Sequence, residues 1–437
     1  MGYSFTMNKL ASDLNDALQN TVVDRQLSDL GRRMYFPKGI VAQAAEAKSK
    51  ATKYNATVGM AYAKGSPMTL PLISELTSPL STEESVAYAP TAGVAALRDA
   101  WKDQILKKNP DLAGIRTTRP AVVPGLTAGI AVVADLFTDA GETLFLPDLF
   151  WGNYRLIFEE RRRCRLQEFT FFNSEGTFDR TAFAEGARSA ATGGKLTVIL
   201  NFPNNPAGFT PSREDVDFIR KTLVNLADSV PVTVISDDAY FGLFYDDDAY
   251  KQSLFTVLAD AHPNLMAIKI DGATKEDFVW GFRIGFVTVA FKGMTEDQAR
   301  AVEQKLTGTI RSMVSNSSML AQSLLLRALN HPDYDKQKEE AFQLLSGRFT
   351  TLKEIIANKE KDKLAPGLQP MPCNSGYFMS FRCNGFSAEA LRLALLEDGV
   401  GVISVKDQFL RVAFAGVDRE LLPGLFDDVF KAADKFR

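Results

Sequence analysis

The sequence predicts an α/β fold: a large domain with a mostly parallel sheet flanked by helices, plus a smaller α+β domain from both termini. Between residues 61 and 340, short runs rich in Val, Ile, Leu and Phe alternate with helical stretches. These runs show little polar alternation, which is typical of strands buried on both faces. After residue 340 the pattern changes to one long helix, a Pro/Gly-rich stretch and short strands around a further helix.

The elements follow in chain order. The expected strands are residues 121–124, 143–147, 196–202, 232–236, 265–270 and 285–290. Helices are expected between them, for example at 128–137 and 214–226, and in the small domain at 343–359 and 388–398. We therefore expect three parts, namely a helical segment 1–60 that packs on the small domain or on a partner subunit, a large domain 61–340 and a small domain 341–437.

Composition excludes several classes of protein. The net charge of −3 gives no electrostatic argument for nucleic acid or an anionic membrane, and no apolar run reaches the length of a membrane span. The N-terminus lacks the apolar core of a signal peptide, and Cys164, Cys373 and Cys383 have no disulfide or zinc spacing. We expect a cytoplasmic protein with no nucleic acid, membrane or metal partner.

Histidine is scarce. A Ser-His-Asp triad, a Cys-His pair or a His-rich metal site would have to use His262 or His331, and each of these precedes a proline in an expected loop. Difficult chemistry in this chain would therefore come from a bound cofactor.

The first candidate site is the turn between strand 121–124 and the next helix. In an open α/β sheet, ligands bind at the carboxyl ends of strands. The free amides after Gly125, at Leu126 and Thr127, suit a phosphate, since a helix N-terminus carries partial positive charge. An ordinary turn with Thr127 as the helix N-cap is the alternative.

Polar residues follow two further strands. Asn205, between prolines, would present its amide at the sheet edge, although simple turn chemistry also explains it. Asp237, Asp238 and Tyr240 follow the next strand. A buried carboxylate needs a partner, such as a protonated pyridine nitrogen, and a helix N-cap is the alternative role.

A lysine and an arginine complete the set. Lys275 follows the strand 265–270 and could form a Schiff base, because lysine pKa values fall readily on burial. Arg283 could bind a phosphate with two parallel hydrogen bonds. The alternative is that both are solvated cations.

In this order, the motifs resemble those of the class I (fold-type I) aminotransferase family, which depends on pyridoxal 5′-phosphate (PLP), and of its aspartate/aromatic branch in particular. The matching segments lie within roughly residues 55–415 and are N-P-A-G at 205–208, D-x-A-Y at 237–240, the lysine at 275, G-F-R-I-G-F around 283 and R-V-A-F-A-G from 411.

The resemblance implies a role for each matching residue. Lys275 would hold PLP as a Schiff base and move the substrate's proton, and Asp237 would pair with the pyridine nitrogen. Asn205 and Tyr240 would hydrogen-bond the ring's phenolic oxygen. Further cofactor contacts would come from Trp151 against the ring and, at the phosphate, from Gly125, Leu126, Thr127, Thr274 and Arg283. Arg411 would bind the substrate α-carboxylate, with Asn205 and Trp151 beside it.

The resemblance also implies a homodimer with shared active sites. Tyr88, in Y-A-P-T-A-G, is similar to a residue that reaches the neighbouring subunit's phosphate. Arg311 is similar to an arginine that contacts the substrate's distal carboxylate across the interface. A turn aromatic and a surface cation are the respective alternatives.

Two positions depart from the family pattern. Gly272 replaces a serine that usually helps bind phosphate, and Thr274 could supply a hydroxyl instead. Tyr154 stands where the aspartate branch usually has a histidine.

The expected function is transfer of an amino group between an L-amino acid, acidic or aromatic, and a 2-oxo acid by a ping-pong mechanism. A PLP-dependent β-lyase or decarboxylase on the same scaffold is the first alternative. The second is a non-enzymatic effector domain of a transcription regulator, although such proteins carry an N-terminal winged-helix module and only about 55 residues precede the α/β pattern here.

Overall fold

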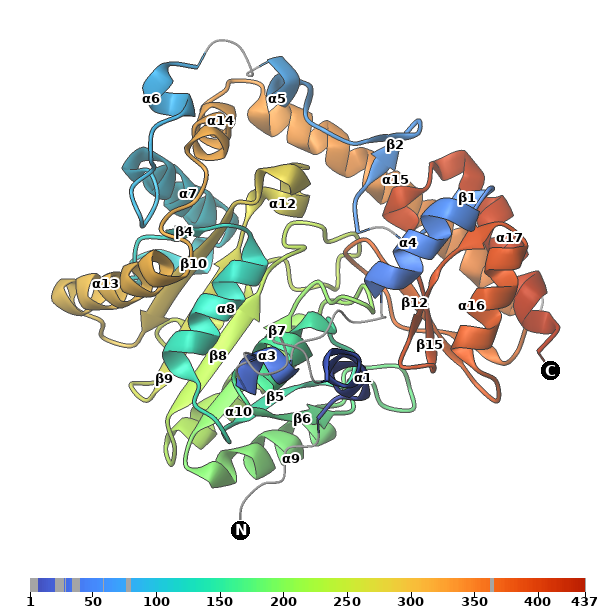
Figure 1. Cartoon of the computed structure of the whole chain (residues 1–437), viewed down its shortest axis with the longest axis horizontal. Coiled ribbons are helices and arrows are strands. Elements are labelled where there is room, and N and C mark those ends of the chain that lie inside the picture. Colours follow the sequence, from blue (N-terminus) through green and yellow to red (C-terminus); the bar gives the residue numbers. More distant parts are fainter. Residues whose placement is uncertain are drawn as a thin grey trace.

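The structure, a computed structural model, describes residues 7–19, 27, 29–33, 40–57, 59–75, 80–361 and 365–436. Within this part of the chain, a large α/β domain lies beside a smaller α+β domain (Figure 1). The predicted fold class is confirmed. None of the described helices is long and apolar enough to cross a membrane.

The large domain is organised around a sheet whose described strands have the order β4-β10-β9-β8-β7-β5-β6. They are β4 (Ala121–Val123), β5 (Thr143–Pro147), β6 (Arg165–Phe169), β7 (Leu196–Asn201), β8 (Val232–Asp237), β9 (Leu265–Asp271) and β10 (Gly285–Phe291). Strands β5 to β9 pair in parallel, whereas β10 is antiparallel to both β4 and β9. The sheet is therefore mostly parallel, with one reversed strand beside β4.

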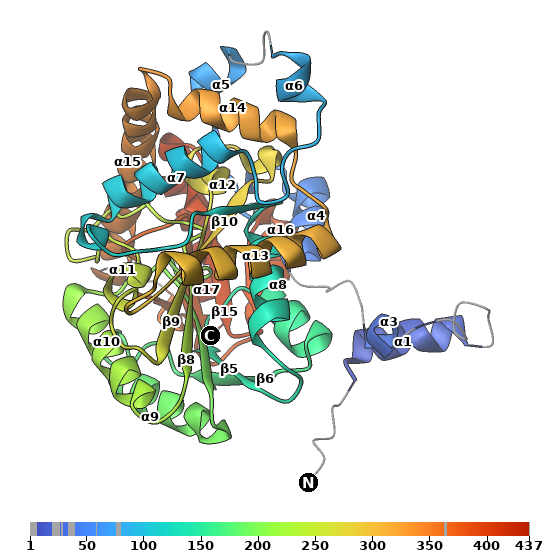
Figure 2. The ribbon, with the colours of Figure 1, turned by 90° about the vertical axis from the view of Figure 1, so that its left-hand side faces the viewer.

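Helices cover both faces of this sheet. Figure 2 shows α8 and α13 on one side and α9, α10 and α11 on the other. The helices of the large domain are α5 (Pro71–Glu75), α6 (Thr82–Ser85), α7 (Ala95–Lys108), α8 (Leu126–Phe137), α9 (Arg180–Ala190), α10 (Arg213–Ala227), α11 (Leu254–Leu258), α12 (Ala273–Glu276), α13 (Glu296–Met313), α14 (Met319–Leu329) and the π-helix η2 (Arg155–Arg161). Short 3-10 turns lie at Pro110–Leu112, Ala191–Gly193 and, as η4, Trp280–Phe282.

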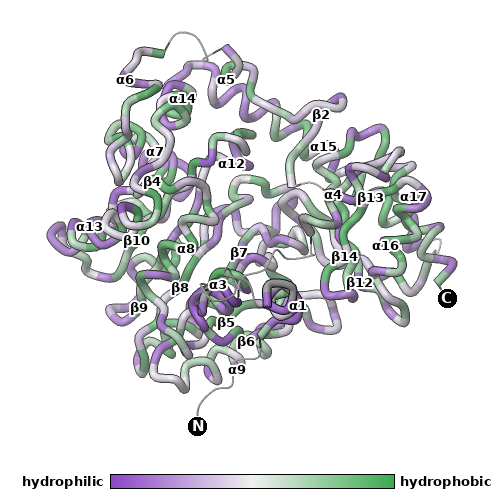
Figure 3. Tube along the Cα trace, viewed as in Figure 1, coloured by the Kyte–Doolittle hydropathy of each residue, from purple (hydrophilic) through white to green (hydrophobic). Residues whose placement is uncertain are grey.

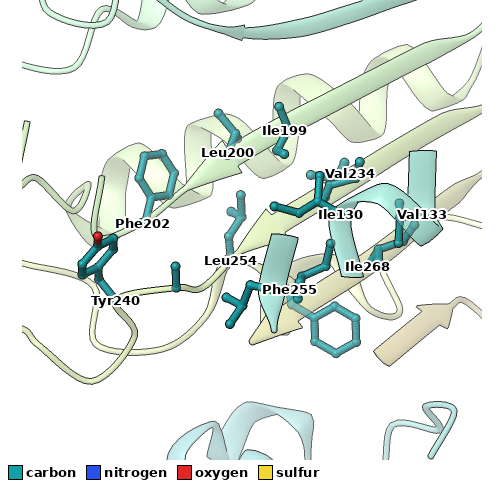
Figure 4. Packing of buried hydrophobic residues seen from close by; sticks show 14 of the residues in the cluster. Ile130, Val133, Ile199, Leu200, Phe202, Val234, Tyr240, Leu254, Phe255 and Ile268 are labelled. Atoms are coloured by element: carbon teal, nitrogen blue, oxygen red, sulfur yellow. The ribbon is translucent and has the colours of Figure 1, made fainter. Parts of the chain in front are cut away.

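The core of the large domain lies between the sheet and these helices. Figure 4 shows Ile130 and Val133 of α8 in this core together with Val234 and Ile268 of the sheet, all of them buried. Hydrophobic residues gather toward the sheets, and hydrophilic residues are more frequent at the rim (Figure 3). Burial on both faces explains why the strand sequences are apolar without alternation.

The small domain has its own core and an antiparallel sheet with the order β11-β12-β15-β14 among the described strands. Its elements are β11 (Leu368–Pro370), β12 (Met379–Cys383), α16 (Ala388–Glu397), β13 (Val400–Gly401), β14 (Ile403–Val405), β15 (Phe409–Val412), the 3-10 turns η5 (Phe414–Gly416) and η6 (Arg419–Leu421), and α17 (Leu422–Asp434).

The N-terminal elements divide between the two domains. Helix α4 (Ile40–Lys50) packs on β13 and β14, and β1 (Tyr54–Asn55) pairs in parallel with β13. The hairpin β2 (Tyr62–Ala63) and β3 (Ser66–Pro67) follows. Helices α1 (Lys9–Leu18) and α3 (Asp29–Arg33) stand apart in Figure 2, and α3 contacts η2 of the large domain. The expectation for residues 1–60 thus falls partly outside the described residues.

One helix, α15 (Tyr334–Lys361), connects the domains (Figure 1). Near its start, Lys338 Nζ lies 2.9 Å from carboxylate oxygens of both Glu276 and Asp277. Ten residues further on (348 − 338), Arg348 pairs with Asp418 at 2.7 Å and donates to the carbonyl of Ala415 in η5. The same helix therefore contacts α12 in the large domain and the segment after β15 in the small one.

Several boundaries differ from the prediction. All six expected strands are present, but β6 was not expected, because its sequence RLQEF is largely polar and only Phe169 is buried. Helix α8 begins at Leu126 instead of residue 128, and α15 begins at Tyr334 instead of residue 343. The first turns of α15 are mainly polar, so the apolar pattern begins late.

Candidate active site

A cavity of about 320 Å³ includes residues from the carboxyl ends of β7, β8 and β9 together with Arg411 of the small domain. Most of the side chains singled out in the sequence line it: Leu126, Thr127, Trp151, Asn205, Asp237, Tyr240, Thr274, Lys275, Arg283 and Arg411. His262 and His331 lie elsewhere, in loops. The expected clustering at strand ends is therefore present, and it contains no histidine.

The N-terminus of α8 forms one end of the cavity. Gly125 is the N-cap residue, with φ +84°, and no side chain caps the helix there. The alternative role of Thr127 as the N-cap is thus wrong, and the first amides of α8 remain available to a ligand. A Cβ on Gly125 would lie 2.2 Å from Nη2 of Arg283, so the guanidinium sits directly against this turn. An anion here would meet amides, helix dipole and a cation together.

Close packing beside this turn explains the departure at Gly272. A Cβ there would lie 2.7 Å from the carbonyl oxygen of Ile284 and 2.9 Å from Cα of Gly285. Gly285 in turn has no room for a Cβ, which would lie 2.9 Å from the Leu126 nitrogen. A serine does not fit at 272. Thr274 lines the cavity instead, and its buried hydroxyl has no hydrogen-bond partner among the described residues.

Asp237, the last residue of β8, presents a buried carboxylate to the cavity. One oxygen accepts from the phenol of Tyr154, and the other accepts from the backbone N–H of Ala239 at 3.1 Å. Burial raises the pKa of Asp237, while these hydrogen bonds and nearby Lys275 oppose the rise. The neighbouring Asp238 instead bonds to Ser253 and Lys269, away from the cavity.

Lys275 lies in the short helix α12 after β9, with its Nζ 4.9 Å from the centroid of the Tyr240 ring. Burial lowers the pKa of Lys275 to about 8, with a further lowering from Arg283 and an opposing effect of Asp237. The phenol of Tyr377 donates to the Lys275 carbonyl at 3.1 Å. Burial also raises the pKa of Tyr240, which therefore remains a neutral phenol. Because its pKa is lowered, the Lys275 amine is partly unprotonated and nucleophilic near neutral pH.

A hydrogen-bonded chain links the two domains across the cavity. Asn201 at the end of β7 accepts from the Asn205 backbone N–H at 2.8 Å and donates to the Asp237 carbonyl at 2.7 Å. The Asn205 side chain accepts from Nη1 of Arg411 at 3.0 Å, and Nη2 of Arg411 donates to the Thr57 carbonyl. Turn chemistry alone does not explain Asn205, since its side chain contacts the small domain.

Arg411 is buried in β15, and burial lowers its pKa to about 10. It has no carboxylate partner among the described residues, and its Nε lacks a hydrogen bond there. The Phe378 ring lies 4.3 Å from the guanidinium carbon. Phe378, Trp280 and Asn201 line the cavity and were missed in the sequence, since each looks like ordinary packing or turn chemistry.

Two predicted residues lie outside the cavity. Tyr88 follows α6 and is 91% exposed. Arg311 lies near the end of α13, where it is exposed and donates to Ser315 at 2.6 Å. Within one subunit, neither can take the role implied for it.

The donors fit PLP. Arg283 and the start of α8 offer an anion site, Lys275 offers an amine, and Asp237 offers a carboxylate between Tyr154 and the cavity. The unpartnered hydroxyl of Thr274 and the unpaired guanidinium of Arg411 need an acceptor and an anion. On this fold, the set defines an enzyme that depends on PLP.

Comparison with known proteins extends this result. The model of the family "Aminotransferase class I and II" matches residues 60–428, and the chain belongs to this family. It is accordingly a PLP-dependent aminotransferase. It is 22% identical over 361 residues to a probable aspartate/prephenate aminotransferase of Aquifex aeolicus, covering 78% of this chain and 82% of that protein.

Solved structures agree on the fold. An aminotransferase from Anaerococcus prevotii superposes with a TM-score of 0.80 at 21% identity, covering 92% of this chain and 97% of the other. A mutant aspartate aminotransferase of Thermus thermophilus gives 0.75 at 20% identity, covering 93% and 100%.

Proposed function

We propose that this aminotransferase moves an amino group between an L-amino acid, acidic or aromatic, and a 2-oxo acid in a ping-pong cycle, with the cavity around Lys275 as its active site. The observation that carries the proposal is the placement of one amine of lowered pKa between an anion site at α8 and the unpaired guanidinium of Arg411. When bound, PLP supplies an electron sink that acidifies the substrate's Cα proton.

Lys275 would hold the cofactor covalently through Nζ. Its free amine would then move a proton between the substrate's Cα and the cofactor's C4′, which lie on either side of the shared nitrogen. A pKa of about 8 leaves a useful fraction of the amine unprotonated at neutral pH, as a general base requires. Asp237 would hold the pyridine nitrogen protonated, and Asn205 and Tyr240 would donate to the phenolic oxygen.

Two cations would orient the ligands. Arg283, with the amides of Leu126 and Thr127 and the hydroxyl of Thr274, would bind the phosphate. Arg411 would bind the substrate's α-carboxylate, a planar group that suits the guanidinium fork. Trp151 would cover the ring face. With both anionic ends held, the Cα–H bond is kept close to Lys275, which is the positioning that accelerates proton transfer.

We propose that the active enzyme is a homodimer in which Tyr88 reaches the partner's phosphate site and Arg311 reaches the partner's substrate. The exposure of Val86 (77%) and Tyr88 (91%) supports this, because a partner surface would cover both side chains. A hollow of about 320 Å³ lined by Arg283, Phe282 and Leu320 adjoins the anion site. The free Cys164, Cys373 and Cys383 support a reducing, cytoplasmic location.

The name of the Aquifex relative supports a dicarboxylate among the donors. The test is a panel of amino acids, each added alone to the loaded enzyme while the cofactor's visible absorbance is followed. Acidic or aromatic donors should convert the cofactor, and Lys275→Ala should abolish the response. Release of pyruvate or CO₂ without a 2-oxo acid acceptor would instead indicate a β-lyase or decarboxylase, and DNA binding would indicate a regulator.

The variant Arg311→Leu tests whether Arg311 determines donor specificity without taking part in catalysis. The change should weaken acidic donors selectively, because only they carry a distal carboxylate. An equal loss for aromatic donors would contradict the role proposed for Arg311 and leave the general reaction intact.

A further inference from the structure

Tyr154 is a buried aromatic residue that does not line the cavity, although its phenol reaches Asp237, which does. Only 1% of Tyr154 is exposed. Because the other Asp237 oxygen is held by the Ala239 N–H, the carboxylate has one protein donor on each oxygen. The Tyr154 phenol therefore helps to hold the Asp237 carboxylate in one orientation.

The ring of Tyr154 is held from two sides. It stacks on Phe150 with centroids 6.3 Å apart and meets Trp151 edge-on at 5.6 Å. Immediately afterwards the chain forms the π-helix η2, a rare conformation that is frequent at functional sites. One segment thus carries both Trp151, which lines the cavity, and the donor to Asp237.

The groups around this pair come from several elements. Asp237 faces Tyr154 and Lys275, and Tyr154 faces Asp237 and Tyr240. The charge of Arg283 helps to lower the pKa of Lys275, and the charge of Arg411 opposes the rise in the pKa of Tyr240. Burial and the Asp237 charge raise the pKa of Tyr154 well above its usual range, so the phenol is protonated at neutral pH.

We propose that Tyr154 is a positioning residue whose phenol donates permanently to Asp237 and so keeps this carboxylate ionised and oriented toward the cofactor's ring nitrogen. The inference rests on the proposed role of Asp237. A histidine at this place, the residue usual in the aspartate branch, is a group that can change charge within the physiological pH range. A phenol does not, and the pairing here is therefore insensitive to pH over the neutral range.

The first test is Tyr154→Phe, which removes the hydroxyl and retains the ring packing. The matched control is Tyr245→Phe, because the buried Tyr245 hydroxyl has no hydrogen-bond partner among the described residues. Tyr154→Phe should weaken PLP binding to the apoprotein about 10- to 100-fold, the effect expected for a hydrogen bond to a charged group. It should lower kcat by a similar factor, with little change in KM.

The pH profile supplies a readout that packing would not move. The Tyr154 hydrogen bond lowers the pKa of Asp237, so its loss raises that pKa. The acid limb of kcat/KM and of the cofactor's absorbance should therefore shift to higher pH. Tyr154→His supplies an N–H donor in both protonation states, so it should recover part of the PLP affinity and add an inflection to the pH profile where the imidazole titrates.

Unchanged PLP affinity and pH profile in Tyr154→Phe, equal to those of Tyr245→Phe, would overturn the inference. So would a Tyr154→His enzyme without a new inflection, and this arm stands if the phenylalanine variant does not fold. Asp237→Asn separates the two proposals. If it binds PLP and turns over normally, the proposed function fails at Asp237, whereas a damaged Asp237→Asn beside a normal Tyr154→Phe refutes only the role of Tyr154.

Discussion

Gly125→Ala tests how the anion site is built. The residue has φ +84° and ψ 163°, a region that is essentially restricted to glycine and costs other residues about 1–3 kcal/mol. The added Cβ would also lie 2.2 Å from Nη2 and 2.7 Å from Cζ of Arg283. The guanidinium must move by about an ångström or more to reach ordinary contact distance.

Two separable losses follow. Backbone strain should lower the free energy of unfolding of the apoprotein by about 1–3 kcal/mol. Displacement of Arg283 should remove a hydrogen bond to a charged phosphate, worth about 1.5–3 kcal/mol, and so weaken PLP binding about 10- to 100-fold beyond the effect of strain. Urea unfolding measures the first loss, and equilibrium titration of the apoprotein with PLP measures the second.

Gly141→Ala is the matched control. Gly141 also has a positive φ, of +87°, but a Cβ there would meet nothing within 4 Å. It should show the strain without the loss of affinity. If Gly125→Ala binds PLP as tightly as Gly141→Ala does, the contact between the turn and Arg283 does not build the phosphate site.

Three further predictions concern the neighbouring residues. Gly272→Ser should leave PLP affinity no better and lower the apoprotein's unfolding free energy by about 1–3 kcal/mol through overpacking, as measured by urea unfolding. The rate at which apoprotein captures PLP, followed by stopped-flow absorbance, should rise with pH through about 8, because the unprotonated amine of Lys275 is the nucleophile. Lys108 and Lys338 lower the pKa of the Glu276 carboxyl to about 2, so the stability it contributes should be full above pH 4.5 and be lost as the pH falls toward about 2. Glu276→Gln should cost about 3–5 kcal/mol at pH 7 by leaving the partly buried Lys108 and Lys338 undercompensated, and should flatten this acid dependence in urea unfolding.

The controls for these predictions use the same assays. Tighter PLP binding in Gly272→Ser would show that a serine does fit the turn. A capture rate that is flat between pH 7 and 9, or that still rises about tenfold per pH unit at pH 9, would contradict a pKa of about 8 for Lys275. Asp247→Asn, which removes an exposed pair with Lys251, should leave the acid dependence unchanged, and an equal effect of both carboxyl variants would refute the special role of Glu276.

Much of the large domain could be predicted from the sequence. Strands β7, β8 and β9 are buried on both faces, so their apolar runs mark them directly, and their polar ends give Asn205, Asp237 and Lys275. Strand β6 escaped prediction because an edge strand can remain polar on most of its length. The start of α8 at Leu126 escaped because a glycine N-cap without a side-chain bond leaves no capping motif in the sequence.

The missing parts of the site depend on long-range contacts. Tyr154 could be located beside Trp151, but its bond to Asp237 spans 83 residues and has no local pattern. The reason for Gly272 lies in the approach of Ile284 and Gly285, which only the packed sheet brings near. Tyr88 and Arg311 lie outside the cavity, and their roles across a subunit interface stay predictions.

Helix α15 holds two distant groups at a fixed spacing. Lys338 secures the turn that carries Lys275, and Arg348 secures the segment that follows Arg411. Ten residues of helix correspond to about 15 Å along its axis. Helix α15 therefore holds the segment beside Lys275 and the segment after Arg411 at a fixed spacing from outside the cavity. Residues that do not line the cavity thus contribute to the distance between the amine and the proposed carboxylate site.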